Sequence, residues 1–276
     1  MGVSVRTGLE RGGTVGGMDE PVVLRSDAGG VATLTLNRPK ARNALSVELM
    51  GALQEQLASI DRDPAVKVVV LVGNGPAFSA GHDLREIQAH PDPAFRQALF
   101  EQCSALMMTV VGLRQPVIAK VTGVATAAGC QLVASCDLAV AASSARFATP
   151  GVNIGLFCST PMVALSRNVS AKHSMEMLLT GEMVDAPTAE RYGLVNRVVP
   201  DDELDAAVED LAAAVAAKSG LVLAIGKEAF HRQREMLLAD AYAYTAEVMA
   251  KNLEAADATE GIEAFLAKRE PIWQDR

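Results

Sequence analysis

Cysteine, positive charge and long hydrophobic runs are all scarce in this chain of 276 residues. The four cysteines form no CxxC pair and have no histidine-rich neighbourhood, so neither a disulfide framework nor a cysteine-based metal site is indicated. With 25 Lys and Arg against 33 Asp and Glu, the formal net charge is −8, which argues against a nucleic-acid-binding surface. No uninterrupted apolar stretch approaches the roughly 20 residues that span a bilayer, so we expect a soluble protein that contains no membrane segment.

The N-terminal residues also lack the apolar core of a secretory signal peptide. We therefore expect residues 1–19 to form a flexible tail and the protein to be cytoplasmic, with its cysteines reduced. The chain does have the composition of a globular protein, because half of its residues are hydrophobic and 21% are charged. A chain of this length can bury a substantial core.

Apolar runs alternate with helical patterns through the first two thirds of the chain. Residues 31–36 are typical of a strand, and Ser46 is a good N-cap for the helix that follows. Residues 66–72, 117–121 and 138–142 are almost continuously apolar, as strands covered on both faces are. Strands separated by helices predict an α/β domain with parallel crossovers.

Strand patterns nearly stop after about residue 171, and helical patterns follow to the C-terminus, with two helices expected over about 222–238 and 239–255. We find no internal repeat and no long linker. The sequence thus predicts a core over residues 20–200 and a helical region over residues 201–276. That helical region is expected to pack on the core or on a neighbouring subunit.

Two glycine-containing turns are candidates for a binding site. In Phe78–Leu84, Gly81 permits a tight turn, so that the backbone N–H of His82 could face a cavity; an ordinary strand-to-helix turn is the alternative. In Gly123–Asp137, small residues run into a helix whose positive end would face a ligand; a tightly packed helix is the alternative. A thioester carbonyl between the N–H groups of His82 and Ala128 would have two donors, each worth roughly 3–4 kcal/mol in a dry site.

Basic residues gather in two short segments of this acidic chain. Arg38, Lys40 and Arg42 form a local cluster of the kind that binds phosphates, although a solvated basic loop is the alternative. Lys268 and Arg269 lie near the end of the last predicted helix, where interaction with the helix C-terminus would also explain them.

Taken together, these segments give the sequence a family resemblance. The segments that carry it, in chain order, are Asn37–Leu45, Ser79–Leu84, Gly123–Asp137, Phe147–Gly155 and Gly261–Arg269. Each is weak alone, but the ordered set resembles the crotonase (enoyl-CoA hydratase/isomerase) family over roughly residues 20–275. Within that family, Ala127–Gln131 combined with Ala148–Pro161 is most similar to the enoyl-CoA hydratase domain-containing protein 3 subgroup.

The resemblance implies both a fold and a ligand. The fold would be a crotonase-like ββα spiral core with C-terminal helices that trimerise, commonly into a hexamer built as a dimer of trimers. The ligand would be an acyl-CoA or enoyl-CoA thioester of fatty acid metabolism, bound without a metal or redox cofactor, with coenzyme A as part of the substrate. The thioester oxygen would be held by the backbone amides of His82 and Ala128. The residues expected to contact substrate or coenzyme A are Arg38, Lys40, Arg42, Ala80, Gly81, Asp83, Leu84, Pro150 and Lys268.

Both carboxylates that hydratases of the family typically carry are missing. Their positions match Gln131 and Gly151, which with His82 and Ala128 complete the expected catalytic set. An amide can orient water but cannot exchange a proton usefully, and general acid–base help is typically worth 10²–10⁴-fold. We therefore expect hydratase-type activity to be weakened, and expect Glu at both positions to raise it. The alternative is a non-catalytic acyl-CoA-binding or assembly protein on the same fold.

Several other side chains were considered as replacements for the missing acids. We expect the imidazole of His82 to point away from the site while its backbone serves it, and Asp83 to start a helix rather than donate protons. Cys158 is expected to be an inert buried thiol. Ser159 and Thr160 have no visible histidine partner. The remaining polar candidates, all expected to be turn, surface or packing residues, are His90, Asn153, His173 and His231.

Overall fold

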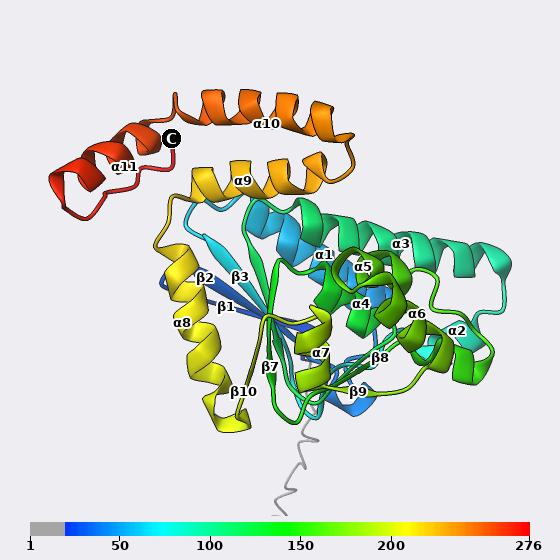
Figure 1. Cartoon of the computed structure of the whole chain (residues 1–276). Helices are drawn as coiled ribbons and strands as arrows, with labels where there is room; N and C mark the ends of the chain where they lie inside the picture. The colour runs from blue at the N-terminus through cyan, green and yellow to red at the C-terminus, as the bar shows by residue number, and fades with distance from the viewer. Residues whose placement is uncertain (1–19) are drawn as a thin grey trace, which may run out of the picture.

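The computed structural model describes residues 20–276, and the predicted tail over residues 1–19 lies outside the described residues. Two sheets organise the core (Figure 1). The larger has the order β1-β2-β3-β5-β7-β10. Its strands are β1 (Val23–Ala28), β2 (Val31–Leu36), β3 (Val68–Gly73), β5 (Val117–Val121), β7 (Leu138–Ala142) and β10 (Arg197–Val199). The first pair is an antiparallel hairpin, and every other neighbouring pair is parallel.

The smaller sheet is built from short strands in the order β4-β6-β8-β9. These are β4 (Ala77–Ser79), β6 (Val124–Thr126), β8 (Arg146–Ala148) and β9 (Val184–Asp185). Strands β3, β5 and β7 are each followed along the chain by a strand of this second sheet, so that successive turns add one strand to each sheet. The predicted α/β class and the ββα spiral are confirmed. The short strands were not predicted, because three residues are too few to show a periodicity.

Helices cover both faces of the larger sheet, as the apolar strands predicted. One face packs on α1 (Val47–Asp61), α3 (Pro93–Gly112) and α4 (Ala128–Ser135). The other face, which includes Val68 and Ile118, packs on α8 (Leu204–Ala216). Ser46 caps α1 as predicted, since its hydroxyl accepts from the Leu49 N–H at 3.2 Å. The remaining helices of the core are α2 (Leu84–Ala89), α5 (Pro161–Asn168), α6 (Ala171–Thr180) and α7 (Ala186–Tyr192).

Helix α9 (Gly220–Gln233) lies against the core, where its Lys227 pairs with Asp137 at 2.7 Å, and α10 (Leu238–Asn252) and α11 (Ala256–Ala267) extend beyond it (Figure 1). Helix α9 ends at Gln233 rather than near residue 238. The two helices predicted over 222–238 and 239–255 therefore begin and end a few residues earlier than expected. Packing of α8 on the sheet ties the start of the predicted helical region to the core, and the proposed division at residue 200 stays a prediction. Within residues 20–276, no helix combines the length and the apolarity needed to cross a membrane.

Candidate active site

The turn after β4 leaves the backbone N–H of His82 without a partner. Gly81 has a φ of +90°, which favours glycine, and its carbonyl accepts from the Leu45 N–H at 2.8 Å. In a planar trans peptide the C=O and N–H point in opposite directions. The N–H of His82 therefore points away from Leu45, and no acceptor for it lies among residues 20–276.

A second free N–H lies at the start of α4. Ala127 has a φ of +49° and a ψ of −119°, an uncommon backbone conformation for a residue with a side chain. Its carbonyl accepts from the Gln131 N–H at 3.0 Å, so the N–H of Ala128 in the same peptide points out of the helix N-terminus. This donor also has no acceptor in the described part of the chain, and the helix dipole makes its surroundings positive.

Backbone contact joins the two turns. A Cβ placed on Gly81 would lie 2.8 Å from the Ala127 Cβ and 3.3 Å from the Ala128 nitrogen. A Cβ on Gly129 would collide with the carbonyl of Ser79. The structure therefore brings the two predicted segments together, at a separation that only glycine permits.

Asn43 fixes this arrangement, and the sequence reasoning missed it. Its fully buried side chain donates to the carbonyls of Asn74 at 2.9 Å and Ala77 at 2.8 Å, and accepts from the Arg38 N–H at 2.9 Å. The Ser79 hydroxyl donates to the Asn43 carbonyl at 2.9 Å. Asn43 thus ties the loop before α1 to β4. The signal in the sequence was an asparagine in a turn, since Asn tolerates the left-handed conformation observed here, with a φ of +52°.

Asp83 has the structural role that was expected. Its carboxylate accepts from the N–H groups of Arg85 and Glu86 at the start of α2, and pairs with Arg38 at 2.9 Å. Burial opposes the change, but these hydrogen bonds lower the pKa of Asp83 below its ordinary value, so it is a carboxylate and not an acid at neutral pH. The guanidinium of Arg38 also donates to the Ala44 carbonyl at 2.7 Å, so internal contacts hold a residue predicted to bind phosphate.

The other predicted coenzyme A contacts are divided between two regions. Lys40 and Arg42 are exposed and have no ion-pair partner among residues 20–276. Ala80 donates its N–H to the Arg42 carbonyl. The side chain of Leu84 is exposed. Lys268 ends α11, which lies on the opposite side of the molecule from α2 (Figure 1). A single chain does not bring Lys268 to the other basic residues. Its neighbour Arg269 is paired with Glu260 at 2.6 Å.

Neither of the two positions where the resemblance implies a glutamate has an acid. Gln131 is buried in α4, where its side-chain oxygen accepts weakly from the Cys103 thiol at 3.9 Å. Gly151 lies in the short 3-10 helix Pro150–Ile154, and a Cβ there would meet the Leu156 carbonyl oxygen at 2.5 Å and the Cys158 sulfur at 2.9 Å. The loop is closed around a glycine, so a Glu side chain here would require the loop to shift, and the expected gain in hydration with Glu at both positions stays a prediction.

The imidazole of His82 packs between Leu45 and Phe100, and the expectation that it points away from the site stays a prediction. Its Nδ1 faces the Leu45 carbonyl oxygen at 3.4 Å, and its ring meets the ring of Phe100 edge to face at a centroid distance of 5.3 Å. Its Nε2 is buried, and the part of the chain that the structure describes offers it no hydrogen-bond partner. Burial lowers the pKa of this histidine, so the ring is neutral at neutral pH.

The remaining candidates have ordinary structural contacts. His90 stacks on Phe95 and His173 on Tyr192. His231 lies close to a carboxylate: its Nε2 is 3.6 Å from Asp137. The sequence did not predict this contact. Cys158 is buried, and burial raises the pKa of its thiol, as expected of an inert cysteine. The hydroxyl and amide candidates have at most loop contacts: Ser159, Thr160 and Asn153.

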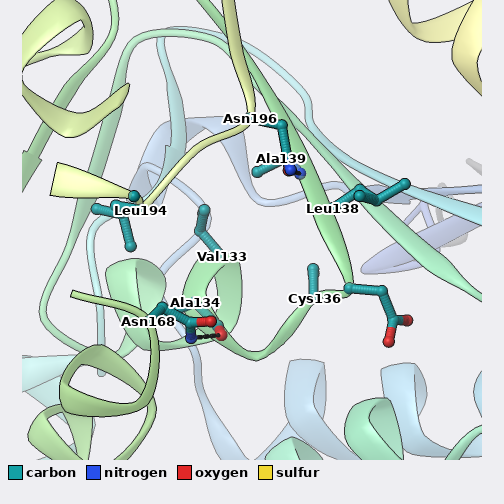
Figure 2. Close-up of a pocket in the computed structure, with 10 residues that line it drawn as sticks. Val133, Ala134, Cys136, Leu138, Ala139, Asn168, Leu194 and Asn196 are labelled. Carbon is teal, nitrogen blue, oxygen red and sulfur yellow. Dashed lines mark hydrogen bonds between the residues drawn. The ribbon is translucent and has the colours of Figure 1, made fainter. Parts of the chain in front are cut away.

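Figure 2 shows a cavity of about 80 Å³ at the C-terminal end of α4, away from the free N–H of Ala128. Val133, Ala134 and Cys136 line it on one side, and the Asn168 amide donates to the Ala134 carbonyl at 2.8 Å (Figure 2). The free N–H of Ala128 is at the start of the same helix, so this cavity is not part of the predicted site. Its small volume would hold water rather than an acyl chain.

Two joined turns with unpartnered donors on a ββα spiral define a protein class. The sequence matches the family description Enoyl-CoA hydratase/isomerase over residues 26–276, and the chain belongs to that family. Among solved structures, an enoyl-CoA hydratase of Mycobacterium smegmatis is 50% identical, with a TM-score of 0.90 over 92% of this chain and 99% of the other. The human enoyl-CoA hydratase domain-containing protein 3 is 43% identical, with a TM-score of 0.89 over 91% and 100%.

Sequence relatives agree with the predicted subgroup. The Xenopus laevis enoyl-CoA hydratase domain-containing protein 3, mitochondrial, is 45% identical over 92% of this chain and 86% of its own length. The resemblance to this subgroup is confirmed. The predicted cytoplasmic location is wrong, because the frog, rat, mouse, zebrafish and human relatives are all named mitochondrial. Reduced thiols and the lack of a secretory signal do not distinguish these compartments, since organelle transit peptides have a different composition.

Proposed function

We propose that this chain binds an acyl-CoA or enoyl-CoA thioester and polarises its carbonyl with the backbone N–H groups of His82 and Ala128. The observation that carries the proposal is the pair of unpartnered donors on two turns in backbone contact. Donors fixed before the substrate arrives need no reorganisation when negative charge develops on the thioester oxygen. Activation of this kind needs no metal or redox cofactor, and coenzyme A enters only as part of the substrate.

Without an acid at either position, this site lacks the groups that fast hydration uses. Hydration requires one group to activate water and another to protonate the α-carbon, and the two positions are Gln131 and Gly151. A non-catalytic acyl-CoA-binding or assembly role is the alternative, and the closed loop around Gly151 favours it. The alternative predicts tight acyl-CoA binding with no chemical change in the thioester.

Exposed apolar side chains on the C-terminal helices support an oligomer, which we propose is a trimer or a dimer of trimers. Phe265 and Leu266 of α11 are 83% and 74% exposed, and Leu238 and Tyr242 of α10 are 75% and 71% exposed. Apolar surface of this extent usually marks an interface. A neighbouring subunit would then be the source of the Lys268 that contacts coenzyme A. Native mass spectrometry would test the assembly.

The first experiment is incubation with 2-enoyl-CoAs of several chain lengths, with product mass and the conjugated-thioester absorbance followed together. Loss of absorbance with the addition of one water would establish hydration. A matched variant is Ala128→Pro, which removes one donor at the first position of α4, where helices tolerate proline. Its thermal unfolding and its affinity for free coenzyme A serve as controls. A folded variant that keeps the wild-type carbonyl polarisation of a bound enoyl-CoA would contradict the proposal.

A further inference from the structure

The buried Nε2 of His82 has no hydrogen-bond partner among residues 20–276, although it belongs to the residue whose backbone N–H is proposed to hold the thioester oxygen. Buried polar atoms are nearly always hydrogen-bonded, and leaving one unsatisfied typically costs about 1–3 kcal/mol. Such an atom needs an explanation. A packing histidine on an exposed helix face would have reached solvent instead.

The surroundings of the ring select its protonation state. The Leu45 carbonyl oxygen can only accept a hydrogen bond, so the Nδ1 that faces it at 3.4 Å is the nitrogen that carries the proton. In a neutral ring the other nitrogen, Nε2, then has a free lone pair. Burial keeps the ring neutral, and no charged side chain contributes to that shift. Nearby carboxylates are occupied, because Asp83 pairs with Arg38 and Glu86 accepts from the Val47 N–H.

Helix α3 contacts both this imidazole and the side chain of Gln131. The His82 ring contacts Phe100, and the Gln131 amide contacts Cys103, three residues further along α3. Residues three apart lie on one face of a helix. The thiol of Cys103 is the titratable group on that face, and burial raises its pKa to about 12, so it does not compete as a base.

We propose that Nε2 of His82 is the proton-transfer group of this site, acting on the α-carbon of the bound thioester. This inference rests on the function proposed above. Nε2 takes one α-proton, the electrons of that C–H bond form a C=C bond to the carbonyl carbon, and the carbonyl π electrons move onto the oxygen held by the two N–H groups. The imidazolium then returns the proton to the same carbon or, in a 3-enoyl thioester, to the γ-carbon. Electrons and atoms balance without an oxidant or water.

One base that takes and returns one proton suits α-proton exchange and double-bond migration better than hydration, which also requires an activated water. The test uses 3-enoyl-CoAs of several chain lengths in D₂O, with deuterium incorporation read by mass and the 2-enoyl product by absorbance. His82→Asn keeps a donor at the position of Nδ1 and removes Nε2. His82→Gln keeps a polar group at the position of Nε2 without a usable base. Both variants keep the backbone N–H.

We expect wild-type protein to incorporate deuterium and both variants to lose at least about 100-fold of that rate. The carbonyl stretch of the bound thioester, read by infrared difference spectroscopy, should not change. The wild-type rate should fall as acid protonates the imidazole, and this limb of the pH profile should be missing from the residual activity of the variants. His90→Asn, which changes an exposed histidine stacked on Phe95, is the matched control and should behave as wild type.

The outcomes separate the two proposals. A His82 variant with wild-type exchange, or wild-type protein that polarises the thioester without exchanging its α-proton, would overturn the role of the imidazole and leave the binding site intact. Wild-type protein that neither binds nor polarises an acyl-CoA would overturn the proposed function, and the role of the imidazole with it.

Discussion

Substitution of Gly151 tests most sharply how tightly the loop is packed at the position where the resemblance implies a glutamate. In Gly151→Ala the new Cβ would lie 2.5 Å from the Leu156 carbonyl oxygen, where ordinary van der Waals contact begins near 3.4 Å. That oxygen cannot withdraw alone, because the Leu156 N–H is bound to the Gly151 carbonyl at 2.9 Å. The Cys158 sulfur, 2.9 Å from the Cβ, accepts from the Gly151 N–H on the same side.

Overpacking of a closed site typically costs about 1–3 kcal/mol. For a chain of this size, each kcal/mol lowers Tm by about 2–4 °C, so we expect Gly151→Ala to lower Tm by about 2–12 °C. Differential scanning calorimetry would measure the shift. Gly112→Ala is the matched control, because a Cβ on that helical glycine meets nothing within 4 Å and should leave Tm unchanged or slightly higher. Cys158→Ala should relieve only part of the loss, since the Leu156 oxygen remains.

An unchanged Tm for Gly151→Ala would refute the closed loop, and with it the steric argument against a glutamate there. The same experiment bears on function. If the loop is closed as described, Gly151→Glu should destabilise the protein without raising hydration, whereas Gln131→Glu alone tests the remaining acid position. A hydration rate that rises with Gly151→Glu in a stable protein would show that the loop can open at little cost.

Three further outcomes follow from buried polar groups. Asn43→Ala should lower the free energy of unfolding, measured in urea, by about 3 kcal/mol or more, because two carbonyls and one N–H lose their hydrogen-bond partner. The control Asn153→Ala removes one hydrogen bond of 3.4 Å and should cost less than about 1 kcal/mol. The free energy of unfolding should fall as pH drops below 6.5, because the pKa of His82 is lower in the folded state than in the unfolded chain and protons then favour unfolding; a His82→Asn variant with the same pH dependence would contradict this. Burial raises the pKa of Cys103 and Cys130 to about 12, so iodoacetamide at pH 8 should label them only after denaturation, as peptide mass mapping would detect.

Local features of this fold were predictable, and contacts between distant segments were not. The cap at Ser46 follows from residues within a few positions of each other. The contact between Gly81 and Ala127 joins segments more than forty residues apart, and only the family resemblance suggested it. Nothing in the sequence indicates a positive φ at Ala127, since alanine rarely adopts it.

The site residues divide in the same way. The absence of acids at Gln131 and Gly151 could be read from the sequence, but the sequence could not reveal that Cys158 and the Leu156 carbonyl enclose the second position. Asn43 was missed because its importance lies in bonds to residues more than thirty positions away. The direction of the His82 ring depends on Leu45 and Phe100, which belong to two other elements.

Backbone hydrogen-bond donors and acid–base side chains differ in how easily a mutation removes them. Backbone donors such as the N–H groups of His82 and Ala128 persist through any side-chain change that keeps the turns, and together they would supply roughly 6–8 kcal/mol of charge stabilisation in a dry site. Acid–base help is worth less, about 3–5 kcal/mol, and depends on single side chains. In the function proposed above, a site without both carboxylates would keep the larger contribution. In our proposal the His82 imidazole, which belongs to one of those turns, acts as the base at the α-carbon of the thioester. Such a base would need no new element of the fold.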